Sequence, residues 1–134
     1  MSQSLVTGLV LIAGYHGINL DKSVIKYKFS DKKGSFGVTQ WILAAKEYSL
    51  HARLVSKSID RLKFISFPAL VLGEEGTIFI LLQAKDNKYL IYDINEKNNK
   101  NLDENEFNAI YSGRIILVYS KKSISDKLQI FDFT

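Results

Sequence analysis

Hydrophobic positions in the first third of the chain recur with the period of an α-helix. Apolar residues between positions 5 and 13 follow this spacing, after Ser4 as a capping residue and before a stop near Gly17. A second, shorter helix is predicted after Asp21, and a third after Thr39. The pattern therefore predicts three helices before about residue 50.

Beyond residue 50 the pattern becomes that of β-strands. Short runs of β-branched and aromatic residues are separated by Glu-Glu-Gly and Asp-Asn-Lys, which are typical of hairpin turns. Helices first and antiparallel strands second predict an α+β domain whose helices pack on one sheet. We expect strands over residues 51–55, 68–72, 77–84, 88–94 and 114–119, a helical turn over 58–64, a polar loop over 95–101, and a short helix after the capping pair Asp103 and Glu106.

Length and composition narrow the classes of function. A chain of 134 residues is about one domain, with a core that needs no disulfide. We assign residues 1–120 to this domain and residues 121–134 to a linker tail. The absence of cysteine excludes a cysteine nucleophile and a thiolate zinc site, and two histidines are too few for a metal site built on several imidazoles. No Gly-rich phosphate-binding motif is present, so we expect no metal and no cofactor in this domain.

The charge is uneven along the chain. Residues 1–67 carry ten Lys and Arg against four Asp and Glu, and residues 68–134 carry eight against ten, so +6 and −2 give the net +4. The basic residues are spread singly, which favours a solvated surface over a nucleic-acid site. No stretch reaches the roughly 18–20 apolar residues that span a bilayer.

Five blocks of the sequence have a familiar order. They resemble the N-terminal cytosolic domain of haemolysin-type type I secretion ABC transporters, a degenerate relative of the papain-like cysteine peptidases that trim double-glycine leaders from bacteriocins. The resemblance covers residues 4–134 and implies a papain-like fold, with a tail that leads toward a transmembrane region. The blocks are SLVTGLVLIAGYHG, GVTQWILAAKEYSL, IDRLKFISFPALVL, YLIYDINEKN and FNAIYSGRIILV.

The resemblance also indicates which catalytic parts have changed. It places Ser4 at the position of the cysteine nucleophile, Ile78 at that of the histidine base, and Asp93 at that of the orienting aspartate. Isoleucine accepts no proton, and an unassisted serine hydroxyl is a poor nucleophile. His16 lies roughly 18 Å from Ser4 along the first helix, and nothing brings His51 near. We therefore expect a degenerate domain that is not an enzyme.

The family implies a role in export. The domain is expected to bind an unfolded RTX-type toxin or adhesin at the cytoplasmic face of the bacterial inner membrane. Implied partners are this substrate, the rest of a homodimeric ABC transporter and a membrane fusion protein, with no nucleic acid. ATP and Mg²⁺ are expected in the nucleotide-binding domain of the full protein. Substrate is expected to contact the lining of the former cleft, namely Tyr15, Phe36, Trp41, Leu72 and Tyr92.

Structural readings compete with each of these roles. Ser4 also suits a helix cap, Asp93 also suits a strand end, and aromatic residues also fill a core. Two other functions stay open. One is a residual leader peptidase that uses Ser4, and the other is a regulatory domain that contacts only the transporter itself.

Overall fold

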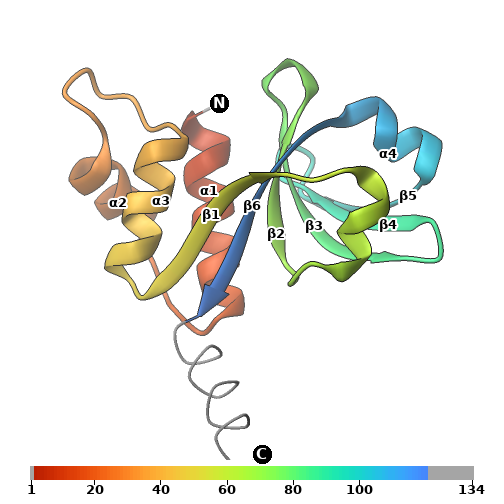
Figure 1. Cartoon of the computed structure of the whole chain (residues 1–134). Helices are drawn as coiled ribbons and strands as arrows, with labels where there is room; N and C mark the ends of the chain where they lie inside the picture. Colours follow the sequence, from red (N-terminus) through yellow and green to blue (C-terminus); the bar gives the residue numbers. More distant parts are fainter. Residues whose placement is uncertain (1, 121–134) are drawn as a thin grey trace, which may run out of the picture.

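The three N-terminal helices pack on one face of the sheet (Figure 1). The computed structural model describes residues 2–120. Helix α1 spans Ser2–Tyr15, α2 spans Lys22–Phe29 and α3 spans Val38–Glu47. The three predicted helices are therefore confirmed, and the predicted tail over residues 121–134 lies outside the described residues.

The helix ends follow local capping chemistry. Asp21 caps α2, because its carboxylate accepts two backbone N–H groups of the first turn. The left-handed backbone of Gly17, with φ at +79°, follows the end of α1. Two predicted caps were misplaced: α1 begins before Ser4, and α3 begins after Gly37, whose N–H donates to the Gln40 side chain, so that Thr39 lies inside the helix.

The strands form one antiparallel sheet in the order β1-β6-β2-β3-β4-β5. Among the described strands β6 comes last in the sequence, yet it lies between β1 and β2 and pairs with both. The predicted α+β fold, with helices on an antiparallel sheet, is confirmed. The strands are β1 Leu50–Ser56, β2 Ala69–Gly73, β3 Ile78–Lys85, β4 Lys88–Asp93, β5 Asn98–Asp103 and β6 Tyr111–Ser120; short helices η1 Ile59–Phe64, η2 Glu74–Gly76 and α4 Glu104–Ile110 connect them.

One strand contradicts the sequence pattern. The segment expected to be a polar loop, residues 95–101, overlaps β5, which pairs with β4 along its whole length. Its sequence, NNKNLD, has no alternation of apolar and polar residues, so hydrogen bonds to β4 hold it rather than burial of one face. The capping pair of Asp103 and Glu106 that follows is confirmed at the start of α4.

Two hydrophobic cores lie on the two faces of the sheet. Trp41 is fully buried in the core beneath the helices, where it belongs to one cluster with Leu70 and Ile116. On the other face Phe107 stacks on Tyr89, with ring centroids 4.4 Å apart. Because both faces are covered, the site candidates lie where the elements end: the start of α1, the start of β3 and the end of β4.

Candidate functional site

The start of α1 meets the turn that follows β4. Ser4 is half-buried in the first turn of α1, and its hydroxyl donates a hydrogen bond of 3.4 Å to Oδ1 of Asn95. Asn95 is two residues beyond Asp93, which ends β4. The fold therefore brings the predicted nucleophile position near the predicted orienting aspartate, although 89 residues separate Ser4 from Asp93 in the sequence.

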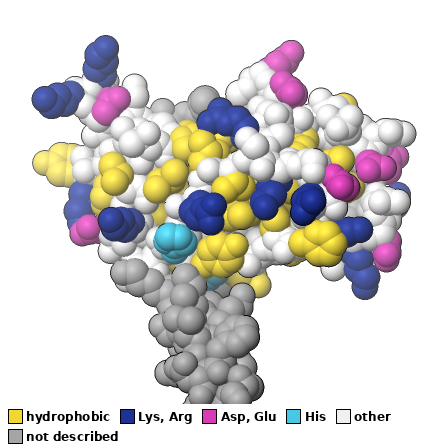
Figure 2. All heavy atoms as spheres, in the orientation of Figure 1, with side chains coloured by type: hydrophobic (Ala, Val, Ile, Leu, Met, Phe, Trp, Pro, Cys, Tyr) yellow, Lys and Arg dark blue, Asp and Glu magenta, His cyan; other side chains and the backbone are white. Residues whose placement is uncertain are grey.

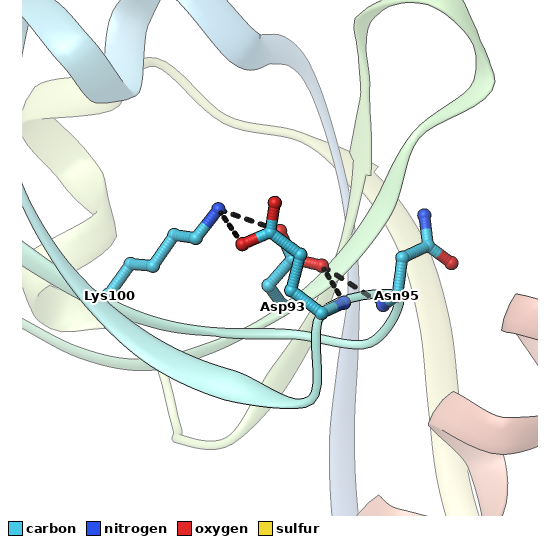
Figure 3. Close-up of polar contacts among 4 residues, drawn as sticks. Asp93, Asn95 and Lys100 are labelled. Atoms are coloured by element: carbon cyan, nitrogen blue, oxygen red, sulfur yellow. Dashed lines mark hydrogen bonds and ion pairs between the residues drawn. The ribbon is translucent and has the colours of Figure 1, made fainter.

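The carboxylate of Asp93 is fully engaged by its own turn and by β5 (Figure 3). Its Oδ1 accepts the backbone N–H groups of Asn95 and Glu96, at 2.9 and 3.0 Å. Its Oδ2 forms an ion pair of 3.1 Å with Lys100, which also contacts Glu96 at 2.8 Å. Asp93 thus stabilises the β4–β5 turn, and sequence reasoning missed Lys100 because its segment was expected to be a loop.

Electrostatics keep this pair charged. Burial would raise the pKa of Asp93, but hydrogen bonds from the Glu96 N–H and from Lys100 outweigh it and hold the pKa below its usual range. The contacts to Glu96 and Asp93 raise the pKa of Lys100. An aspartate that orients a catalytic histidine accepts a hydrogen bond from the imidazole N–H, whereas Asp93 accepts one from the ammonium group of Lys100.

Ile78 borders the same cavity as Asp93. It is the first residue of β3 and is 5% exposed. A cavity of about 340 Å³ is lined by Ile78, Asp93, Asn95 and Lys100, together with neighbours from β4, β5 and α4. The fold therefore places Ile78 and Asp93 on one cavity, and Ser4 reaches its edge through the hydrogen bond to Asn95. At the position where the resemblance predicts the base, the side chain is aliphatic and accepts no proton.

Neither histidine lies beside Ile78. His16 follows the opposite end of α1 from Ser4, and partial burial lowers its pKa. His51 is exposed on β1, where its ring lies 6.5 Å from that of Tyr119. Neither residue lines the cavity beside Ile78. Among residues 2–120, no histidine is therefore available as a proton acceptor at this cavity.

Two of the predicted binding residues share an apolar groove. Tyr15 and Tyr92 line a hollow of about 270 Å³ where α1 meets β3 and β4. Tyr15 is 70% exposed and Leu11 is 41% exposed, so a ligand can reach both side chains. Sequence reasoning missed Leu11; its signal is that it is apolar but lies outside the buried stripe of α1. The other lining residues are Ile12, Pro68, Ile80 and Leu82.

The other three predicted binding residues fill the core beneath the helices. Phe36, Trp41 and Leu72 are 2%, 0% and 8% exposed and belong to one cluster. Their place in a groove is therefore not retained, because side chains that pack the core are not available to a ligand. The sequence pattern does not distinguish an apolar residue of a cleft from one of the core.

The described part of the chain has neither a membrane-spanning helix nor a cluster of metal ligands. None of its helices is long and apolar enough to cross a membrane. Residues 2–120 contain no group of three or more His, Cys, Asp or Glu placed to hold a metal ion.

Comparison with protein families agrees with this geometry. Residues 2–123 match the model of the peptidase C39 family. This chain belongs to the peptidase C39 family. The chain is 44% identical over 128 residues to the alpha-hemolysin translocation ATP-binding protein HlyB of Escherichia coli, covering 94% of this chain and 18% of HlyB. It is equally identical over the same length to the exotoxin translocation ATP-binding protein PaxB of Pasteurella aerogenes. The chain thus spans about a fifth of the length of these relatives.

Solved structures share the fold at low identity. One is a double glycine motif protease from an AMS/PCAT transporter in complex with the leader peptide, with a TM-score of 0.77, 18% identity, and coverage of 88% of this chain and 84% of that chain. Another is the N-terminal peptidase C39 like domain of a toxin secretion ATP-binding protein from Vibrio parahaemolyticus, with a TM-score of 0.75, 15% identity, and coverage of 88% and 97%. These likenesses confirm the predicted papain-like fold. The sequence relatives confirm the resemblance to haemolysin-type exporters.

Proposed function

We propose that this chain is a non-cleaving peptidase-like domain of a type I secretion ABC transporter, and that it binds the unfolded protein that the transporter exports. HlyB and PaxB are named for the translocation of a hemolysin and of an exotoxin, which supports a secreted toxin as the substrate, and we propose an RTX-type toxin or adhesin. The rest of a homodimeric transporter and a membrane fusion protein are the further partners, at the cytoplasmic face of the inner membrane. A tethered binding domain raises the local concentration of substrate near the channel.

The observation that carries the proposal is Ile78. Proton transfer to a positioned base contributes a large part of the rate of a serine or cysteine peptidase, and an aliphatic side chain provides none. Ser4 donates its hydrogen bond to Asn95, and Asp93 is paired with Lys100. Each of these contacts differs from the one that catalysis requires.

The groove beside α1 provides a place for an extended chain after catalysis has been lost. Its lining is apolar, and Tyr15 and Leu11 present exposed apolar area next to Tyr92. Burial of an apolar side chain there is favourable by about 25 cal/mol for each Å² removed from water. Ordering of an unfolded partner opposes this gain, so we expect modest affinity.

A titration tests the proposal. The isotope-labelled chain is titrated with an unfolded, calcium-free fragment of the cognate secreted protein, and mass spectrometry follows the same sample. We expect shifts around Tyr15 and Tyr92 with the fragment intact. Tyr15→Ala is expected to weaken binding about fivefold, from loss of about 1 kcal/mol of apolar burial. The matched control is Tyr27→Ala, because Tyr27 is 93% exposed on α2 and does not line the groove.

Three results would contradict the proposal in different ways. Cleavage of a double-glycine peptide that is lost in Ser4→Ala would establish the residual peptidase instead. Absence of binding to every substrate segment would favour the regulatory domain that contacts only the transporter. Binding that Tyr15→Ala and Tyr27→Ala leave equally unchanged would retain the receptor and remove the groove from it.

Export in cells gives a second test. Deletion of residues 1–120 from the full transporter is expected to impair secretion of the substrate while ATP hydrolysis persists, because the nucleotide-binding site lies elsewhere in the protein. Secretion that continues unchanged would contradict the proposed role.

A further inference from the structure

Strand β1 forms one edge of the sheet. Among the described strands it pairs with β6 alone, from Leu50 opposite Ser120 to Ser56 opposite Arg114. The pairing continues one residue further, where the N–H of Lys57 donates to the carbonyl of Gly113 at 2.9 Å. The register is regular over this length, without a bulge.

This register shows which backbone groups point outward. In an antiparallel pair, residues that bond to the partner strand alternate with residues whose N–H and C=O groups point away from it. Because the Lys57 N–H bonds to β6, every second residue before it, including Arg53 and Val55, also bonds to β6. The residues between them, Ala52, Leu54 and Ser56, therefore direct their backbone groups to the outer edge. These three residues therefore offer donors and acceptors to a further strand.

Basic side chains accompany this edge. Arg53 lies on β1, Lys57 directly follows this strand, and Arg61 and Lys63 lie on η1. Figure 2 shows Lys and Arg side chains in a row across this face, with acidic side chains toward its margins. The ion pairs found among the described residues involve none of the four. One acidic residue, Asp60, stands among them on η1.

The charge of the side chains on β1 determines which kind of strand can pair with its outer edge. Two antiparallel copies of β1 paired about Leu54 would place the two Arg53 side chains as diagonal neighbours, about 7–8 Å apart on one face. Like charges at that distance oppose pairing of the chain with itself. Carboxylates on an incoming strand would instead face Arg53 and Lys57.

We propose that the outer edge of β1 binds an acidic, extended segment of the exported polypeptide as a seventh strand of the sheet. The inference rests on the proposed function, because it requires an unfolded substrate. Backbone hydrogen bonds supply binding without demanding one sequence, and the basic row favours segments rich in Asp and Glu. The domain could then hold many different stretches of one long unfolded chain.

Short synthetic peptides test this proposal on the chain of 134 residues. The probe is a capped peptide of alternating valine and aspartate, and its controls are the valine–lysine peptide and the acidic peptide with N-methyl groups on two adjacent central residues. Methylation there blocks both edges of the peptide strand and leaves its charge intact. We expect shifts at Ala52, Leu54 and Ser56 with the acidic peptide, weaker binding at high salt, no binding of the lysine peptide, and at least tenfold weaker binding of the methylated peptide.

Two protein variants separate the backbone from the charge. Ser56→Pro removes an outward N–H while the ladder to β6 stays intact, and proline is tolerated at such positions of edge strands. We expect about tenfold weaker binding, whereas Ser56→Ala is unchanged. Arg53→Glu is expected to weaken binding of the acidic peptide about five- to tenfold and to allow the lysine peptide to bind. An unchanged amide spectrum away from β1 verifies that each variant folds.

The outcomes distinguish this proposal from the proposed function. Equal binding of the methylated and unmethylated peptides would overturn strand addition, since the attraction would then be purely electrostatic. An unfolded substrate fragment that binds Ser56→Pro as well as it binds the original chain would also overturn it, while the receptor function would stand. If the fragment binds nowhere but the acidic peptide binds β1, the proposed function fails and the edge site has another acidic partner.

Discussion

Replacement of Asp93 tests whether this residue now supports structure rather than catalysis. In Asp93→Ala, the N–H groups of Asn95 and Glu96 lose their acceptor, and Lys100 loses one of its two carboxylate partners. The β4–β5 turn that positions β5 depends on these contacts. A catalytic residue without a partner base would instead be removable at little cost in stability.

The structure gives the expected magnitude. Hydrogen bonds in folded proteins contribute about 0.5–1.5 kcal/mol each, and water can replace part of this in an accessible turn. The Asp93 side chain is 26% exposed, so its ion pair adds at most about 1 kcal/mol. We therefore expect Asp93→Ala to lower the free energy of unfolding by about 2 kcal/mol. Asp93→Asn retains an oxygen acceptor and is expected to lose about 1 kcal/mol.

Urea unfolding followed by tryptophan fluorescence measures this difference. The chain has a single tryptophan, Trp41, and it is fully buried, so its emission reports loss of the core. A loss of 2 kcal/mol shifts the urea midpoint by about 1 M and the melting temperature by about 6–8 °C. Stability of Asp93→Ala within about 0.5 kcal/mol of the original would refute the structural role. Lys100→Met should act in the same direction as Asp93→Asn.

Further predictions concern packing and pH. Gly8→Ala is expected to lower the free energy of unfolding by about 1–3 kcal/mol, because a Cβ there would lie 2.6 Å from Cδ1 of Leu70. In the matched variant Gly14→Ala the new Cβ would meet no atom within 4 Å, so the free energy of unfolding should rise by about 0.5–1 kcal/mol. Thermal melts distinguish the two. The Tyr111 hydroxyl donates a hydrogen bond to a backbone carbonyl, and burial raises the pKa of Tyr111 to about 12. Its contribution to the free energy of unfolding is therefore present below pH 10 and is lost as pH rises toward 12. Alkaline unfolding titrations of Tyr111→Phe should lack this loss. The lowered pKa of Asp93 acts oppositely: the stability difference from Asp93→Asn should be constant above about pH 5 and shrink as pH falls below about 4, and a constant difference down to pH 2 would contradict this.

Elements that depend on local interactions were predicted from the sequence, and elements that depend on contacts between distant residues were not. Helices α1 to α3 and the central strands were predicted, because apolar periodicity and capping residues are local signals. Strand β5 was not, because NNKNLD has no such period and becomes a strand only through its pairing with β4. The ion pair of Asp93 with Lys100 depends on that pairing and was invisible for the same reason.

The surfaces available for binding also depend on contacts between residues far apart in the sequence. Of the residues expected in the cleft, Tyr15 and Tyr92 line a groove, whereas Trp41 lies in the core. All three are aromatic, and the sequence does not distinguish the exposed from the buried ones. Basic residues are spread singly in the sequence, but Figure 2 shows Lys and Arg side chains in a row across one face of the molecule.

The sequence by itself determined the family and the α+β class, because both depend on local patterns and on the order of the residues along the chain. It also predicted the loss of the catalytic base, from the isoleucine at position 78. Only the tertiary structure decided which side chains remain accessible and what Asp93 contacts. Exposure and pairing are properties of the assembled sheet and helices, and they depend on residues far apart in the chain. Among the described strands, β1 has an open edge because it pairs with β6 on one side only, and residues more than 50 positions apart in the sequence form that pairing.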